Sequence, residues 1–271
     1  MGQKSNPNSF QLSKKANNVF SSSFNSLEYS NFLKDYLSIS SNLISFFEKN
    51  NCLVKDCHIM LNNDKSFLTI FISFLVLNDI SKKQKDNLLD TSFILNNFWA
   101  IFNKFGYLNS KRIVFQNLNK LVLDKKEKDT EAKINDLFKL FKNEIYFESG
   151  NKLFYILCNV TNSAELLAKF IAYYFKKYHR TSKINKFFNY LQRFVSLIGA
   201  KEKLNFPSIL NGIKIQIKGR FRGSSRTKIR VFEAGSIPLQ TVNINIRYSQ
   251  VHVTSSYGVF GVKVWVLEKN K

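Results

Sequence analysis

The chain has 271 residues, of which 44% are apolar, so it can bury a core of ordinary size. Its 41 basic residues against 19 acidic ones give a net charge of +22. Such an excess repels itself in the folded state and is most simply explained by a polyanionic partner. Nucleic acid is the first candidate and an anionic membrane surface the second. The longest apolar run, Phe67 to Leu77, is too short to span a bilayer.

Little in the sequence indicates a metal site, a cofactor or a leader peptide. Cys52, Cys57 and Cys158 form no even disulfide framework, and no second ligand pair follows the first two, so we expect structural thiols. The first 20 residues have neither the apolar core of a signal peptide nor the arginine-rich character of an imported presequence. The abundance of Phe, Lys, Asn and Ile suggests an AT-rich genome, such as that of an organelle.

The N-terminal half opens with a polar segment, residues 1–27, which we expect to be an extended arm. Apolar residues then recur every three or four positions between Tyr29 and Phe47, Leu37 among them, which predicts a helix ended by Asn50-Asn51. Two strands are predicted at 53–61 and 67–77, joined by a turn at 62–65.

The middle of the chain has no clear period. Residues 78 to about 130 read as an insertion, with an apolar helix near 93–102 and a solvated charge run at 124–133. A short amphipathic helix is predicted from Ile134 to Ile145, followed by a strand from Lys152 to Val160.

The charge is concentrated after Ser163, where 20 basic residues face 4 acidic ones. Asn162, three residues before Glu165, has the form of a capping box and predicts the start of a long helical region. If that helix is continuous, four cations share one exposed stripe, because their spacings return to nearly one direction at 100° per residue. They are Lys169, Lys176, Arg180 and Lys183.

After residue 198 the apolar period changes to two, which predicts a half-buried antiparallel sheet packed on the helices. The alternating sets span residues 213–217, 242–246 and 260–266, and the basic segment Gly219–Val231 between the first two is expected to form a hairpin. Gly258-Val259-Phe260-Gly261 matches the GxxG pattern of RNA-binding KH modules. Because it runs into alternating valines, we predict a strand there, with the glycines serving a tight bend or close backbone packing.

Six segments, in this order, resemble the ribosomal protein S-three family of the small subunit: MGQKSNPNSFQL, SAELLAKFIAYYF, SKINKFFNYL, GIKIQIKGR, GSIPLQT and SSYGVFGVKVWV. The resemblance implies an α+β protein. An N-terminal KH type II-like domain (28–160), with a degenerate GxxG loop and the insertion, would precede a C-terminal α/β domain (161–271) whose helices pack on an antiparallel or mixed sheet. It also implies that Tyr257–Val266 is the final strand. The family's own GxxG loop would fall on Lys125–Asp129, where this chain has no glycine.

The resemblance implies a structural role in the head of the small subunit, without catalysis, cofactor, metal, membrane or small-molecule substrate. The partners implied are small-subunit ribosomal RNA, mRNA and neighbouring proteins of the S-ten and S-fourteen families. A basic cluster at the family's mRNA entrance falls on Ser182 to Lys186, keeping Lys183 and Lys186, with Arg180 as a substitute for the lost arginine. Candidate rRNA contacts are Gln3, Lys4, Arg220, Arg222, Arg226, Lys228 and Arg230. The expected location is the mitochondrial matrix, with the plastid as the alternative.

Two other functions stay open at this point. A free RNA-binding factor, such as a splicing or translation regulator, would have the same charge. A nuclease would need clustered carboxylates, whereas the acids of the basic region are scattered and His58, His179 and His252 lie far apart. Most aromatic residues sit at core spacing, and Tyr248 and Tyr257 are the candidates for stacking on bases.

Overall fold

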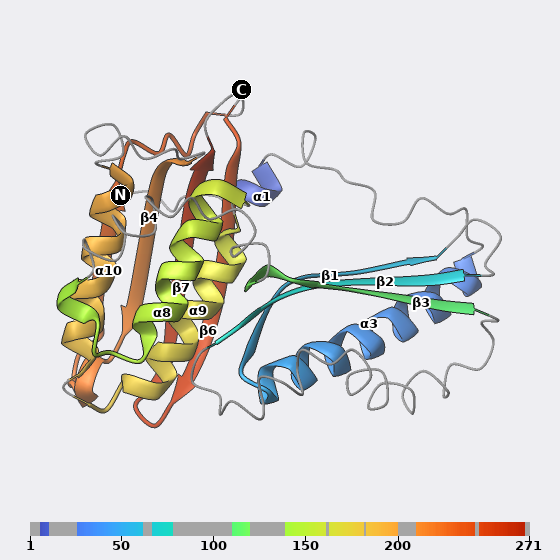
Figure 1. Cartoon of the computed structure of the whole chain (residues 1–271), viewed down its shortest axis with the longest axis horizontal. Coiled ribbons are helices and arrows are strands. Elements are labelled where there is room, and N and C mark those ends of the chain that lie inside the picture. Colours follow the sequence, from blue (N-terminus) through green and yellow to red (C-terminus); the bar gives the residue numbers. More distant parts are fainter. Residues whose placement is uncertain are drawn as a thin grey trace. The chain divides into compact units, whose positions relative to one another are not determined.

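The computed structural model describes residues 6–10, 26–61, 67–77, 110–119, 139–160, 163–181, 183–199, 210–241 and 244–268. The chain forms two compact units, one of residues 17–121 and one that joins residues 1–16 to residues 122–271 (Figure 1). Several predicted features lie outside the described residues: the turn at 62–65, the helix near 93–102, the charge run at 124–133, the cap at Asn162, and Gln3 and Lys4.

The described residues of the unit 17–121 form one long helix and a three-stranded mixed sheet. Helix α3 (Ser26–Lys49) precedes strands β1 (Cys52–Leu61), β2 (Phe67–Val76) and β3 (Ser110–Asn117). β1 and β2 are antiparallel, whereas β2 and β3 are parallel. The predicted helix, strand, strand opening is confirmed. The expected insertion at 78–130, however, includes a strand that belongs to this sheet.

Local chemistry explains both the end and the buried face of α3. Asn51 has φ of 54°, the left-handed conformation that terminates helices and that Asn tolerates well. Ile39, Leu43 and Phe47 follow one another at four-residue intervals and are buried, and the Phe47 ring lies 4.9 Å from that of Phe74 on β2. Leu37, expected on the buried face, is 57% exposed.

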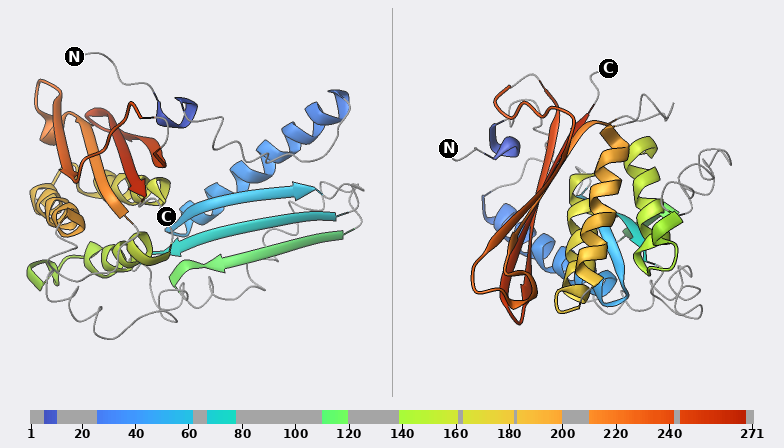
Figure 2. Two further views of the ribbon diagram at one scale, coloured as in Figure 1. Left: turned by 90° about the horizontal axis from the view of Figure 1, so that it is seen from above. Right: turned by 90° about the vertical axis from the view of Figure 1, so that its left-hand side faces the viewer.

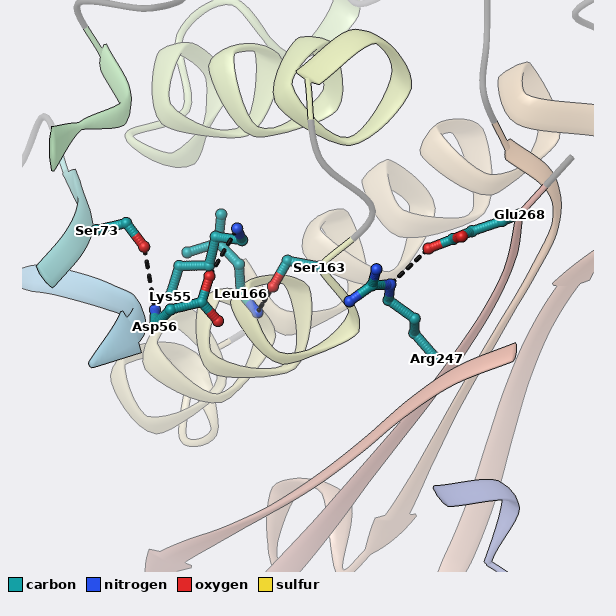
Figure 3. A network of polar contacts seen from close by, with 7 residues as sticks. All are labelled: Lys55, Asp56, Ser73, Ser163, Leu166, Arg247 and Glu268. Atoms are coloured by element: carbon teal, nitrogen blue, oxygen red, sulfur yellow. Dashed lines mark hydrogen bonds and ion pairs between the residues drawn. The ribbon is translucent and has the colours of Figure 1, made fainter. Parts of the chain in front are cut away.

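A bulge interrupts the pairing of β1 with β2 between Val54 and Asp56. The Asp56 amide donates to Ser73 Oγ at 3.2 Å, and Lys55 forms an ion pair with Asp56 at 2.7 Å (Figure 3). The fully buried Ser73 hydroxyl therefore satisfies a backbone donor that the bulge withdraws from the ladder.

The second unit holds a four-stranded antiparallel sheet in the order β5-β4-β7-β6. Its strands are β4 (Leu210–Gly219), β5 (Lys228–Ala234), β6 (Ile246–Ser255) and β7 (Gly258–Glu268). Its helices are α1 (Pro7–Phe10), η1 (Lys139–Phe141), α8 (Tyr146–Tyr155), the π-helix η2 (Ile156–Val160), α9 (Ala164–Tyr178), α10 (Lys183–Gly199) and η3 (Phe221–Gly223). Within the segment expected to be an extended arm, residues 7–10 thus form a short helix, which packs beside β6.

Helices α9 and α10 cover one face of this sheet, α9 over β6 and β7 and α10 over β4 and β5 (Figure 2). The alternation seen in the sequence accounts for the contact, because every second residue in 213–217 of β4 and in 262–266 of β7 points toward the helices and is fully buried. These residues are Ile213, Ile215, Ile217, Val262, Val264 and Val266.

Helix α8 packs on α9 and α10. The Tyr146 ring lies 5.9 Å from Tyr174 on α9 and 5.0 Å from Tyr190 on α10. The predicted strand at 152–160 is wrong: this segment completes α8 and continues as η2. The predicted helix reaching Ile145 is also wrong, because residues 139–145 form a 3-10 turn and bends before α8 begins.

Three boundaries in the second unit differ from those predicted. Ser163 caps α9, accepting a hydrogen bond from the Leu166 amide at 3.1 Å (Figure 3), so the cap lies one residue after Asn162. The helix ends at Tyr178, so the continuous basic stripe is wrong; Lys169, moreover, pairs with Glu165 at 2.7 Å and is only 19% exposed. Strand β6 begins at Ile246, after most of the predicted 242–246 set.

The glycines of the YGVFG segment divide their roles. Gly258 has φ of 108° at the start of β7, which confirms the tight bend. At Gly261 a Cβ would meet no atom within 4 Å, so close packing does not occur there. It occurs instead at Gly219, the last residue of β4, where a Cβ would lie 2.0 Å from Cδ1 of Phe260.

Candidate nucleic-acid interface

The β4–β5 hairpin carries the five described cations expected to contact rRNA. Arg220 and Arg222 lie at its tip, Arg226 in the return, and Lys228 and Arg230 on β5. All five side chains are exposed. The hairpin predicted from the sequence is therefore confirmed as a feature of the fold.

The hairpin tip is fixed by an aromatic anchor. Phe221 places its ring 5.8 Å from Phe175, 5.3 Å from Phe188 and 5.9 Å from Phe260. The next two residues, Arg222 and Gly223, both have positive φ, 54° and 71°, so the chain reverses directly after the anchor. The tip is thus held against the core although its sequence is rich in Gly and Ser.

Strand β5 directs its two cations to the face opposite Ile229 and Val231. Arg230 pairs in register with the inward-facing Ile217 and sets its guanidinium 5.9 Å from the centre of the Phe188 ring, a cation–π contact. Ile229 and Val231 pair with Lys218 and Gln216 on the other face and are 52% and 49% exposed. The cations of β5 therefore lie at the helix side of this sheet edge.

A second group of side chains gathers where three turns meet at one end of the unit. We call it the turn cluster: His179 and Arg180 after α9, Arg222 and Gly223 at the hairpin tip, and Ser256 and Tyr257 between β6 and β7. Arg180 Nε donates to Ser256 Oγ at 3.1 Å, and His179 Nε2 lies 3.4 Å from the same oxygen. The Tyr257 ring meets the His179 ring edge-on at 5.8 Å. A Cβ on Gly223 would lie 3.1 Å from the Tyr257 ring.

The turn cluster brings together a residue from each predicted site. Arg180 was expected at the mRNA entrance and Arg222, next to Gly223, among the rRNA contacts. The other two predicted entrance residues lie on the first turn of α10, where both are exposed. Lys186 Nζ forms an ion pair with Glu144 Oε1 at 3.2 Å, so it points toward the segment before α8. Of the three residues predicted at the mRNA entrance, Arg180 therefore contacts the β6–β7 turn, whereas Lys186 contacts the segment before α8.

Several described carboxylates of this unit pair with cations outside the predicted rRNA contacts. Among the described residues Glu165 pairs with Lys169, Glu233 with Lys214 at 2.5 Å, and Glu268 with Arg247 at 2.5 Å (Figure 3). No ion pair among the described residues involves Arg220, Arg226, Lys228 or Arg230. Within the part of the chain that the structure describes, no acid forms an ion pair with these four cations of the hairpin.

The described residues contain neither a cluster of metal ligands nor a helix that could span a membrane. No three His, Cys, Asp or Glu side chains in that part of the chain lie close enough together to hold a metal ion. None of the described helices has the length and apolar character needed to cross a membrane. Of the three thiols, Cys52 and Cys158 are buried and Cys57 is half-buried.

Comparison with known proteins gives the class of this domain. Residues 204–266, which include β4, β5, β6 and most of β7, match the sequence model described as "Ribosomal protein S3, C-terminal domain". Through this domain the chain is similar to the small-subunit ribosomal protein S-three family.

Similarity to individual relatives is local. A "Small ribosomal subunit protein uS3" of Neorickettsia sennetsu is 31% identical over 109 residues, 40% of this chain and 46% of the relative. A "Small ribosomal subunit protein uS3c" of Chlamydomonas moewusii is 40% identical over 68 residues, 25% of this chain and 8% of the relative. Another uS3c, of Adiantum capillus-veneris, is 47% identical over 55 residues, 20% of this chain and 25% of the relative. The chain matches less than half the length of each.

The partners of the predicted cations were not visible in the sequence. Glu144 and Lys186 are 42 residues apart, and Arg180 and Ser256 are 76 apart. Tyr257 was picked out as a candidate for stacking, but its contacts with His179 and Gly223 depend on three separate turns. Only the fold brings these together.

Proposed function

We propose that this chain is a structural component of the small subunit of an organellar ribosome and binds small-subunit rRNA through the β4–β5 hairpin. One observation carries the proposal. In the domain that matches the family, Arg220, Arg226, Lys228 and Arg230 are exposed and form no ion pair with a described residue. Cations in this state are available to phosphates, and such contacts position a protein on RNA without reading its sequence.

The mRNA entrance is the second part of the proposal. Arg180, Lys183 and Lys186 would line the path of single-stranded message, holding its backbone without base recognition. Glu144 partly neutralises the charge of Lys186, so Lys186 would attract the message more weakly. Lys183 has no ion pair among the described residues and, with Arg180, supplies the stronger field.

The N-terminal part completes the proposed architecture. A KH type II-like domain at 28–160 would serve packing more than RNA reading. Two observations support this: the order of α3, β1 and β2, and the absence of a GxxG sequence from residues 78–138. Gln3 and Lys4, in a proposed arm of residues 1–27, would add rRNA contacts.

Proteins of the S-ten and S-fourteen families, proposed as neighbours, would complete this part of the subunit head. The compartment rests on the relatives. Several carry the name uS3c, the form assigned to chloroplasts, and this favours a plastid ribosome. The mitochondrial location that we expect from the family resemblance stays a prediction. Immunogold labelling of this protein in cell sections, scored over plastids and over mitochondria, decides between the two locations.

Sedimentation tests the proposed function directly. Cell extract is run on a sucrose gradient at moderate salt, and the chain is followed by immunoblotting. We expect it in the small-subunit fractions, with release only at high salt because the contacts are ionic. Recovery exclusively from light, ribosome-free fractions would contradict the proposal and favour a free RNA-binding factor.

A further inference from the structure

Tyr257 is unusual among the aromatic side chains of this protein. Most described aromatic side chains are buried or half-buried. Among the described Phe, Tyr and Trp side chains, the exposed ones are Tyr257 and Phe10. Tyr257 is 37% exposed, whereas Tyr146, Tyr174 and Tyr190 are fully buried. A tyrosine that leaves more than a third of its surface in water at a basic end of the fold calls for an explanation.

The ring is held in place on two sides. His179 meets it edge-on at 5.8 Å, and the lack of a side chain at Gly223 lets it approach the hairpin tip, where a Cβ would lie 3.1 Å from the ring. The backbone beneath it is also fixed, because the Tyr257 amide donates to Ser255 Oγ at 3.2 Å and Ser255 Oγ donates to the Gly258 carbonyl at 2.8 Å. The ring is therefore oriented before any ligand arrives.

Two arginines adjoin the residues around this ring. Arg180 is tied through Ser256 Oγ to the residue that precedes Tyr257. Arg222 adjoins Gly223, whose Cα faces the ring. An oriented aromatic surface beside positive charge is what a single-stranded nucleic acid needs, since a base can stack on the ring while the adjoining phosphates meet the cations.

We propose that the turn cluster is a base-stacking site for single-stranded RNA, in which Tyr257 receives one base and Arg180 and Arg222 bind the adjacent phosphates. His179 and Gly223 act as positioning residues for the ring. This proposal rests on the proposed RNA-binding function and deepens it. It adds to the phosphate contacts a ring on which a base stacks, so the site distinguishes RNA with bases from the backbone alone. Duplex RNA, whose bases are paired and stacked, is excluded as its ligand.

The test separates stacking from charge with two oligomers of equal charge. One is an eight-nucleotide oligoadenylate; the other has the same ribose-phosphate backbone without bases. Binding of each to the full-length chain is measured by fluorescence anisotropy at low salt. We expect Tyr257→Ala to weaken oligoadenylate binding about tenfold and to leave the abasic oligomer unchanged. Tyr257→Phe, which keeps the ring, should bind as the wild type does.

Matched variants give the remaining outcomes. Arg180→Gln should weaken both oligomers, while Val259→Ala, which shortens an exposed side chain two residues away, should weaken neither. Equal loss of both oligomers in Tyr257→Ala would show that the ring only supports the fold, and no loss of either would show that no base stacks there; each result overturns the proposal. Circular dichroism of every variant checks folding. Incorporation of wild-type chain into subunits, measured separately, tests the proposed function itself.

Discussion

Lys186 Nζ lies 3.2 Å from Glu144 Oε1, so one of the three cations proposed for the mRNA entrance is joined to a carboxylate. The lysine side chain is 66% exposed and the glutamate 13%. The glutamate is thus held by the fold, and the lysine comes to it from solvent. This arrangement lowers the positive field that Lys186 can offer to RNA.

Replacing Glu144 should therefore strengthen RNA binding. In Glu144→Gln the carboxylate charge is gone and Lys186 becomes available to a phosphate. We expect affinity for single-stranded RNA to rise about twofold at low salt and the salt dependence to steepen by about 0.7 in logarithmic slope. Glu165→Gln is the matched control, because its partner Lys169 lies on α9 and is only 19% exposed. An equal gain in the control would assign the effect to net charge alone.

Neutralising the two lysines of α10 tests the mRNA entrance. Lys183→Gln combined with Lys186→Gln should weaken crosslinks between messenger and this chain in assembled subunits, while subunit yield stays unchanged. Glutamine is preferable to glutamate at position 186, since a glutamate there would face Glu144. Crosslinks of wild-type strength in this variant would remove both lysines from the proposed entrance.

Charge removal on the hairpin should lower rRNA affinity in steps. Arg220→Gln, Arg226→Gln and Lys228→Gln together remove up to three phosphate contacts, so the logarithmic salt slope should become shallower by up to about 2. Filter binding of an rRNA fragment across a salt series measures it. A control variant neutralises three exposed lysines outside the hairpin, Lys34, Lys49 and Lys139. Identical slopes in the two variants would mean that the hairpin is not the principal contact.

Three glycines of the C-terminal sheet should respond differently to alanine. Gly219→Ala places a Cβ 2.0 Å from the buried Phe260 ring, and we expect a loss of about 2 kcal/mol in the free energy of unfolding. Gly258→Ala should cost about 1 kcal/mol, because φ of 108° strains any side chain. Gly261→Ala meets open space and should stay within about 0.5 kcal/mol of the wild type. Urea unfolding of the three variants provides the comparison, and a large loss at Gly261 would contradict this view of the strand.

The protein should lose stability in alkali. Burial raises the pKa of Cys52 to about 12, and burial likewise raises the pKa of Tyr146 and of Tyr190. Because the folded pKa values lie above the unfolded ones, this stability is complete below about pH 9 and falls as the pH rises toward 12. Denaturant unfolding at a series of pH values measures the decline.

Tyr146→Phe isolates one contribution to this decline. The Tyr146 hydroxyl is buried and has no hydrogen-bond partner among the described residues, so its removal should raise the free energy of unfolding by about 1 kcal/mol and flatten the alkaline limb. Tyr174→Phe is the control. Its hydroxyl lies 2.8 Å from Ser149 Oγ, and its loss should lower stability by a similar amount. Destabilisation by both substitutions would mean that Tyr146 bonds to a group outside the described residues.

Periodicity predicted much of the fold because the corresponding elements bury one face only. α3 and the central strands β4 and β7 show this: Ile213 to Ile217 alternate with Lys214 and Gln216, and the inward valines of β7 alternate with Lys263 and Trp265. The strand predicted at 152–160 was wrong for the opposite reason. Leu153 to Cys158 are all buried, so no alternation separates a buried helix from a buried strand.

Local sequence cannot predict pairing between distant segments. β3 pairs in parallel with β2 across more than 30 intervening residues, and its own sequence, SKRIVFQN, has no strong strand period. The candidate site likewise has one part that the sequence predicts and one part that it does not. The basic hairpin follows from composition, whereas the turn cluster unites residues near 179, 223 and 257, and no spacing rule connects them.

Phe221 lowers the conformational entropy that the hairpin tip would lose when RNA binds. Its sequence neighbours, Gly219-Arg220 and Arg222-Gly223-Ser224-Ser225, would ordinarily form a loop that samples many conformations and is frozen by its ligand. Here the ring sits among Phe175, Phe188 and Phe260, so the conformational entropy of the tip is lost during folding. RNA then meets arginines on a rigid support, and association should proceed without a slow ordering step.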